Sequence, residues 1–228
     1  MGSMAKHRFQ GVVFDLDGTL VDSAPDLHAA LNRLLAAEGR PPVTLDAVKT
    51  MVGDGVGKLV ERGFQATGEV PPAPDLEAAV QRFTADYEQN ATELTSVYPG
   101  AREALSRLHG AGLPLGLCTN KPQLATETLL DHLDLARYMK AVVGGDAVAG
   151  VRKPDPRHVL AVLDRLGVAA RDAVLIGDSP ADIGGAIAAG IPAVAVSFGY
   201  PKMPVEDLGA DIIIDTYDEL EPALASLS

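Results

Sequence analysis

Two acidic side chains directly follow an apolar run near the start of the sequence. Asp15 and Asp17 belong to the segment Asp-Leu-Asp-Gly-Thr at positions 15–19, which continues the apolar run Gly11–Phe14. Two neighbouring carboxylates repel one another unless a cation joins them or one of them holds a proton. At average residue usage the pattern Asp-x-Asp-Gly-Thr has a chance of about 10⁻⁵ per position. The segment therefore indicates a chemical site more strongly than a plain acidic turn, although Asp and Gly both favour turns.

A second acidic segment has the same relation to an apolar run. Asp178 follows the run Ala173–Ile176, and Asp182 stands four residues later, near the expected start of a helix. A plainer interpretation is that Asp178, Ser179 or Asp182 caps this helix. Capping accounts for one of these residues but not for the whole cluster, so the segment is a second candidate site.

Two further polar segments could bind an anion. The segment Thr-Asn-Lys-Pro at 119–122 ends the apolar run Leu113–Cys118. A hydroxyl, an amide and the backbone N–H groups of a helix start can together form an anion cradle. Lys153 precedes a proline, which favours extended backbone at the lysine. Taken alone, the first of these segments is better explained as a helix cap and turn, and Lys153 as an ordinary surface lysine.

The glycine-rich segment Gly53–Lys58 has some features of a nucleotide-binding loop. No apolar strand precedes it, however, and no Ser or Thr follows its lysine. We expect it to be a boundary between helices.

The elements that must position these segments alternate along the chain. Six apolar runs, rich in Val, Ile and Leu, do not alternate with polar residues, as is typical of strands covered on both faces. Helical stretches lie between most of them, which predicts an α/β fold with a doubly wound, mostly parallel sheet. The predicted strands are Gly11–Phe14, Leu113–Cys118, Ala141–Val143, Ala173–Ile176, Ala193–Val196 and Ile212–Ile214. The helices between them are Ala101–Leu108, Gln123–Leu133, Pro156–Leu166 and Ala181–Ala189.

One long insertion interrupts this alternation. About a hundred residues separate the first two predicted strands, far more than a crossover needs. We predict an α/β core of residues 1–21 and 96–228 and a helical cap of residues 22–95, with hinges near Val21 and Val97. Ser23 and Gly39 suit the start and the end of the first cap helix. The predicted cap helices are Ser23–Glu38, Leu45–Val52, Val56–Ala66 and Leu76–Asn90, with turns at 39–42 and 71–74.

The composition limits the possible partners and compartments. The 228 residues include 31 acidic and 19 basic side chains, a formal net charge of −12. Such a surface repels nucleic-acid phosphates and anionic lipids, so we expect neither as a partner. To bind an anionic small molecule, the protein would need a local positive group, such as a metal ion or a few lysines at the binding site. With a single cysteine, no signal-peptide core in residues 1–10 and no apolar run of about 18 residues, we expect a cytoplasmic protein.

The order and spacing of the four polar segments resemble the haloacid dehalogenase superfamily of phosphatases. Asp-x-Asp-Gly-Thr matches its first motif, Thr119 its second, Lys153 its third, and Asp178 with Asp182 its fourth. The resemblance covers essentially the whole chain. It implies a Rossmann-like core in which the first strand lies between the second and the fourth, so that Asp15, Thr119 and Asp178 converge.

Further segments narrow the resemblance to the phosphoglycolate phosphatase family, which has a helical cap after its first motif. They are Leu20–Leu27, Met51–Gly55, Val97–Gly100 and Cys118–Pro122. The implied activity is hydrolysis of a small phosphate ester, 2-phosphoglycolate, to glycolate and phosphate. Asp15 would attack phosphorus and form an aspartyl-phosphate, and Asp17 would act as general acid and base. Mg²⁺ would be held by the carboxylates of Asp15 and Asp178 and by the backbone carbonyl of Asp17.

The resemblance also implies roles for the residues around this centre. Asp182 would support the metal site without binding the ion directly. The cationic cap residues Lys58 and Arg62 are candidates for binding the substrate carboxylate. The groups that would bind the phosphoryl oxygens are Gly18, Thr119, Asn120 and Lys153.

Three alternative functions stay open at this stage. A sugar-phosphate mutase of the β-phosphoglucomutase type would use the same two aspartates, and a broader small-molecule phosphatase would accept larger esters. A phosphate-binding regulatory module without turnover is a third, which the intact motif set argues against. A true dehalogenase would leave Asp17 without a purpose. For the oligomeric state we expect a monomer or a homodimer.

Overall fold

A computed structural model describes residues 8–200 and 202–227 of the chain. The expectation that residues 1–10 contain no signal-peptide core falls mostly outside the described residues. Within the described ranges, no helix is both long enough and apolar enough to cross a membrane.

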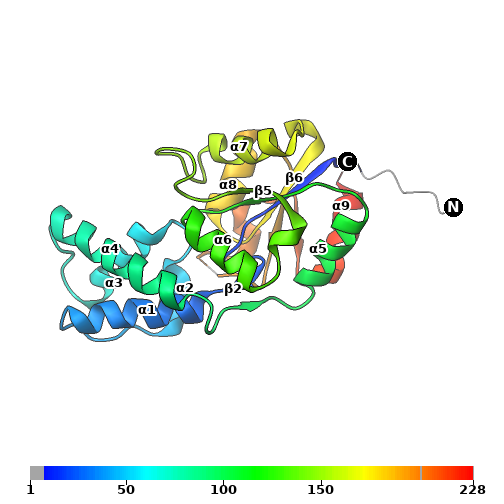
Figure 1. The fold of residues 1–228 in the computed structure, drawn as a ribbon. Helices are drawn as coiled ribbons and strands as arrows, with labels where there is room; N and C mark the ends of the chain where they lie inside the picture. The colour runs from blue at the N-terminus through cyan, green and yellow to red at the C-terminus, as the bar shows by residue number, and fades with distance from the viewer. Residues whose placement is uncertain (1–7, 201, 228) are drawn as a thin grey trace.

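The core is a six-stranded sheet in which every neighbouring pair is parallel (Figure 1). Its order, β5-β4-β1-β6-β7-β8, has the first strand between the second and fourth core strands along the chain. The predicted doubly wound α/β fold is therefore confirmed. The strands are β1 (Gly11–Phe14), β4 (Leu115–Cys118), β5 (Met139–Val143), β6 (Ala173–Gly177), β7 (Ala193–Val196) and β8 (Ile212–Ile214).

Helices cover both faces of this sheet, which explains why its strands read as continuous apolar runs. Val12 and Phe14 of β1 pack in one hydrophobic cluster with helices α5, α6 and α9, whereas Val13 packs in another cluster with α7 and α8. The helices are α5 (Ala101–Gly110), α6 (Gln123–His132), α7 (Pro156–Leu166), α8 (Pro180–Ala189) and α9 (Leu220–Ser226). Short 3₁₀ turns are η1 (Ala136–Tyr138), η2 (Ala170–Asp172), η3 (Val205–Leu208) and η4 (Tyr217–Glu219).

The inserted helices gather at one end of the molecule, at the left of Figure 1. They enclose a hydrophobic cluster of their own, which includes Leu31, Val60, Phe64 and Phe83. One boundary of these helices differs by more than one residue from the sequence-based expectation. The last helix begins at residue 73 instead of 76, because a proline fits the first turn of a helix, where no N–H partner is needed. The helices are α1 (Ala24–Ala37), α2 (Leu45–Met51), α3 (Val56–Thr67) and α4 (Ala73–Asn90).

A short ribbon joins these helices to the core. The strands β2 (Val21–Asp22) and β3 (Ser96–Val97) pair antiparallel, so the outgoing and returning chain lie side by side. This ribbon was not predicted from the sequence. It lies where hinges between core and cap are expected, and it fixes the two crossings relative to one another.

Candidate active site

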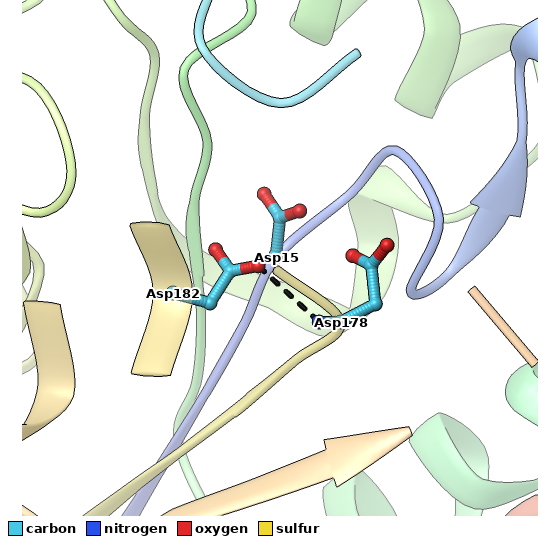
Figure 2. Close-up of side chains that lie close together, drawn as sticks. All are labelled: Asp15, Asp178 and Asp182. Carbon is cyan, nitrogen blue, oxygen red and sulfur yellow. Dashed lines mark hydrogen bonds between the residues drawn. The ribbon is translucent and has the colours of Figure 1, made fainter. Parts of the chain in front are cut away.

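Three buried aspartates meet at the carboxyl ends of two neighbouring strands. Asp15 follows β1 and Asp178 follows β6, and the pairing of Phe14 with Ile176 holds these strand ends in register. One carboxylate oxygen from each of Asp15, Asp178 and Asp182 lies within 4.8 Å of the other two. Figure 2 shows the Asp15 and Asp178 carboxylates pointing to the same side of the sheet edge. Ligand sites in open parallel sheets form at this edge.

The loop after β1 packs closely against the Asp178 carboxylate. Gly18 has a φ of +89°, and a Cβ atom there would lie 2.3 Å from Asp178 Oδ2, so only glycine fits. The Thr19 hydroxyl donates to Asp178 Oδ1 at 3.0 Å, and the Tyr200 N–H donates to Oδ2 at 2.8 Å. These contacts hold the carboxylate in one orientation.

Asp182 belongs both to a helix cap and to the aspartate cluster. Ser179 is the N-cap of α8, and its side chain and that of Asp182 form a capping box. Oδ2 of Asp182 accepts hydrogen bonds from Ser179 Oγ at 2.6 Å and from the N–H of Asp178 at 3.2 Å (dashed in Figure 2). The capping interpretation of this segment is thus correct for two of its residues. The other oxygen of Asp182 faces the site.

Lys153 is the cation that contacts this cluster. Its ammonium donates to Asp15 Oδ1 at 2.6 Å, to Asp182 Oδ1 at 2.5 Å and to the carbonyl of Cys118 at 2.5 Å. These three acceptors use all three of its N–H groups. Burial alone would favour the neutral amine, but the two carboxylates raise the pKa of Lys153 above its ordinary value.

The cluster carries more negative charge than Lys153 can balance. Burial and the Asp182 charge raise the pKa of Asp15 to about 7, although Lys153 opposes this rise. Burial, Asp182 and Asp15 also raise the pKa of Asp178 well above its ordinary value. Three carboxylates facing one ammonium are unfavourable in a buried site unless further positive charge is present. Hard oxygen donors with excess negative charge fit a divalent cation such as Mg²⁺ or Ca²⁺.

The loop after β4 brings the second predicted motif to the same edge. Thr119 is buried, and its Oγ1 accepts a hydrogen bond from the Lys121 N–H, so its own hydrogen can be donated to a ligand. The Asn120 amide donates to the carbonyls of Gly53 and Lys153 at 2.9 and 3.0 Å, and its oxygen accepts from the Lys153 N–H. Asn120 therefore ties this loop to the Lys153 backbone and to a cap loop. Its predicted contact with phosphate stays a prediction.

Asp17 lies beside Asp15 and contacts both core and cap. Ser23 Oγ donates to Asp17 Oδ1 at 2.5 Å, so the serine expected to cap α1 uses its side chain on Asp17 instead. Lys121 Nζ lies 3.0 and 3.2 Å from the two carboxylate oxygens. It also donates to the Tyr87 hydroxyl of α4 at 2.8 Å. Although burial disfavours the ammonium, Asp17 and Tyr87 raise the pKa of Lys121, and the side chain is cationic.

Lys121 and Tyr87 were not predicted as site residues. The position of Lys121 in the loop that carries Thr119 is a signal from which its place in the site could have been predicted. For Tyr87 the sequence holds no comparable signal, because the residue reaches the site only through the packing of α4.

A small cavity of about 30 Å³ lies between these residues and the cap. Core residues form its floor and cap residues its roof, and the roof is mainly apolar. Its lining comprises Asp15, Asp17, Leu27, Val52, Gly53, Gly55, Val56, Leu59, Tyr87, Thr119, Asn120 and Lys121.

The two cap cations predicted to bind substrate have other partners in this structure. Lys58 Nζ pairs with Glu61 at 2.6 Å on an exposed face of α3. Arg62 pairs with Asp54 at 2.6 Å, and Asp54 also pairs with Lys202 of the core at 2.8 Å. Neither Lys58 nor Arg62 is among the described residues that line the cavity. Their binding roles stay predictions.

The fold and the aspartate site define a class of enzyme. The chain belongs to the haloacid dehalogenase-like hydrolases, whose family model matches residues 12–196. The resemblance seen in the sequence is thereby confirmed.

Individual relatives are more specific. The chain is 46% identical over 216 residues to a phosphoglycolate phosphatase of Caulobacter vibrioides, covering 95% of this chain and 91% of the relative. It is also 46% identical over 215 residues to a phosphoglycolate phosphatase of Rhodospirillum rubrum, covering 92% and 89%. Among solved structures, one described as a predicted phosphoglycolate phosphatase from Haemophilus somnus 129PT superposes with a TM-score of 0.90 at 26% identity. That superposition covers 96% of this chain and 99% of the other.

Proposed function

We propose that this chain is a Mg²⁺-dependent phosphatase that hydrolyses 2-phosphoglycolate to glycolate and phosphate. The observation that carries the proposal is the buried cluster of Asp15, Asp178 and Asp182, in which Lys153 joins Asp15 to Asp182, together with the neighbouring carboxylate of Asp17, which Lys121 and Ser23 hold in place. The relatives named phosphoglycolate phosphatase support the choice of substrate.

Asp15 is the nucleophile of the proposed reaction. Its Oδ1 is held by Lys153, and in this proposal its second oxygen attacks a substrate in the cavity that Asp15 lines. That oxygen forms a bond to phosphorus while the bond from phosphorus to the ester oxygen breaks, giving an aspartyl-phosphate and an alkoxide. Water then attacks phosphorus and releases phosphate, which restores the carboxylate. Splitting the reaction in this way replaces one difficult step by two easier ones.

Asp17 moves the protons of both steps. It lines the cavity next to Asp15 and is oriented by Ser23. Its carboxyl group donates a proton to the departing alkoxide, and the resulting carboxylate takes a proton from the attacking water. One residue can serve both steps because the leaving oxygen and the incoming water occupy the same side of phosphorus.

The metal would be held by the carboxylates of Asp15 and Asp178 and by the backbone carbonyl of Asp17. A bound Mg²⁺ would neutralise charge on the phosphoryl oxygens and would shield Asp15 from its anionic substrate. Asp182 acts through its neighbours, because its two oxygens are engaged by Lys153 and by the Ser179 cap. It keeps Lys153 charged and in place.

The phosphoryl oxygens require donors in addition to the metal. The Thr119 hydroxyl can donate a hydrogen bond to a phosphoryl oxygen in the cavity. The positive charge of Lys153, which contacts Asp15, would stabilise the negative charge of the phosphoryl group from beside the nucleophile. The Asn120 N–H is the further donor of the proposed phosphate site. The Gly18 N–H donates to the Val21 carbonyl at 2.9 Å in this structure, so its contact with phosphate stays a prediction.

Residues 22–95 act as a cap in this proposal. The space of about 30 Å³ holds little more than a water molecule or two, so a phosphate ester enters only when the cap moves away from the sheet. Closure then excludes water from the first step. Lys58 and Arg62 stay candidates for substrate contacts from the cap, and a cytoplasmic monomer or homodimer stays our expectation.

The proposal is tested with a panel of phosphate esters, each assayed with Mg²⁺ and with EDTA. We expect phosphate release from 2-phosphoglycolate that requires the cation and exceeds release from sugar phosphates. Isomerisation of a sugar phosphate without phosphate release would support a mutase, and hydrolysis of larger esters alone would support a broader phosphatase. Binding of phosphate without turnover of any ester would make the chain a regulatory module. Full activity in EDTA would overturn the metal-dependent mechanism.

A further inference from the structure

Lys121 has an unusual environment for a lysine. Its side chain is only 3% exposed, yet it lines the cavity beside Asp15 and Asp17. Lysine is rarely buried so fully without a partner that compensates its charge. Here the partners are the Asp17 carboxylate and the Tyr87 hydroxyl, with the ammonium also 4.6 Å from the centre of the Tyr87 ring.

The positive charge of the cavity lining comes from Lys121. The other buried lysine, Lys153, has its three N–H groups engaged by Asp15, Asp182 and a backbone carbonyl. Among the described lining residues, Lys121 is the cation that a ligand in the cavity would meet. A second anionic group on the substrate, besides the phosphate, would therefore be drawn to it.

The chemistry of the ester fixes where such a group lies. The oxygen of the scissile ester must come within hydrogen-bonding distance of Asp17 to receive its proton. In an ester of an α-hydroxy acid, one carbon separates that oxygen from the carboxylate carbon, so the carboxylate oxygens lie only about 3 Å from it. Lys121 Nζ is itself 3.0 Å from Asp17 Oδ1. The carboxylate of a bound α-hydroxy acid ester thus falls within reach of the Lys121 ammonium.

We propose that Lys121 binds the carboxylate of the alcohol half of the substrate and thereby selects phosphate esters of α-hydroxy acids. This inference rests on the proposed phosphatase function and assigns its specificity to a core lysine instead of Lys58 or Arg62. On binding, the substrate carboxylate shares the ammonium that Asp17 holds in the free enzyme. Tyr87 is a positioning residue, since its hydroxyl keeps the ammonium at the cavity when α4 is packed against the core.

The test compares two substrates that differ in the carboxylate. Kinetic constants for 2-phosphoglycolate and for ethyl phosphate are measured with the unmodified protein, Lys121→Met and Lys121→Arg, with Mg²⁺ present. Because a charge-assisted hydrogen bond is lost, we expect Lys121→Met to lower kcat/KM for 2-phosphoglycolate about 10- to 100-fold more than for ethyl phosphate. Lys121→Arg should keep part of the preference. Lys49→Met, on cap helix α2 and outside the cavity lining, is the matched control and should leave both substrates unchanged.

A second measurement covers the case in which Lys121→Met fails to fold because Asp17 is left unpaired. The double variant Asp17→Asn with Lys121→Met removes both charges of this buried pair together, and it is compared with Asp17→Asn, which keeps the Lys121 ammonium. Slow turnover in both allows 2-phosphoglycolate and ethyl phosphate to be titrated by calorimetry. We expect the double variant to lose affinity for 2-phosphoglycolate about 10- to 100-fold relative to Asp17→Asn, and to bind ethyl phosphate equally well.

The outcomes separate this inference from the proposed function. Equal losses for both substrates would mean that Lys121 only positions Asp17, and the inference would be overturned while the phosphatase function stood. An unmodified protein that hydrolyses ethyl phosphate as well as 2-phosphoglycolate would overturn the carboxylate selection directly. An unmodified protein that hydrolyses neither ester would overturn the proposed function itself.

Discussion

Lys153 Nζ lies 2.6 Å from Asp15 Oδ1, and this contact connects the chemistry of the site to its stability. The same ammonium contacts Asp182 at 2.5 Å, so one cation serves two carboxylates while Asp178 stands nearby. The arrangement keeps Asp15 in place for attack on phosphorus, but it leaves negative charge in excess. The excess negative charge of the aspartates is therefore expected to lower the free energy of unfolding when no metal ion is bound.

Replacing Asp15 separates these two effects. Asp15→Asn removes the nucleophile, so kcat should fall at least about 10³-fold. It also removes one of the buried negative charges, so the metal-free variant should unfold at the same temperature as the parent or higher. Phosphate release and thermal unfolding in EDTA check the two expectations. Turnover close to that of the parent would exclude Asp15 as the nucleophile.

Much of this site follows from local sequence rules. Parallel strands end at one edge of the sheet, so the apolar runs before Asp15 and Asp178 were enough to predict that both carboxylates lie at that edge. A helix cap at Asp178, Ser179 or Asp182 was also an interpretation open from the sequence, and Ser179 proves to be the cap of α8, because capping depends on neighbours in sequence.

The rest of the site depends on packing between distant segments. Tyr87 reaches Lys121 only because α4 folds back over the core, and no local pattern specifies that contact. Tyr200 approaches Ser23 across 177 positions of sequence. Lys58 was a candidate as a cationic cap residue, but an acidic residue three positions away on the same helix provides a nearer partner.

Replacing Asp17 should stop turnover without removing the metal. Asp17→Asn cannot donate or take the proton, so kcat should fall by about 10² to 10⁴-fold. The backbone carbonyl proposed as the metal ligand is unchanged, so Mg²⁺ affinity should stay within about threefold of the parent. That range is well below the 1.4 kcal/mol of a tenfold change. Calorimetric titration with Mg²⁺ checks this. Loss of binding would contradict the ligand role given to the carbonyl alone.

The pH dependence of stability should differ between the metal-free and metal-bound protein. Burial raises the pKa of Asp15 from 3.8 to about 7 without a cation. Between these pH values the folded chain binds more protons at this group than the unfolded chain, so the free energy of unfolding falls as pH rises. In EDTA, the unfolding midpoint should therefore drop between pH 4 and pH 7.

Saturating Mg²⁺ should reduce or remove this drop, because the cation stabilises the ionised carboxylates and binds only the folded site. Asp15→Asn in EDTA is the control and should flatten part of the slope. Identical profiles with Mg²⁺ and EDTA would mean that the aspartate cluster does not bind the cation.

The Tyr200 hydroxyl should stabilise the junction between core and cap. It accepts hydrogen bonds from the N–H groups of Ser23 at 2.7 Å and Ala24 at 2.9 Å, and it donates to Asp22 at 2.9 Å. The first turn of α1 has no side-chain cap of its own, so this hydroxyl takes that place. Tyr200→Phe leaves the buried Ser23 N–H without its acceptor, whereas the Ala24 N–H keeps Asp22 Oδ1 at 3.3 Å, and the change should cost about 1–3 kcal/mol. Thermal unfolding measures the loss, with Tyr138→Phe as the matched control, because that hydroxyl contacts only the exposed Arg137 among the described residues. An unchanged unfolding temperature in Tyr200→Phe would show that water satisfies the start of α1, and the junction would then owe its stability to the ribbon of β2 and β3.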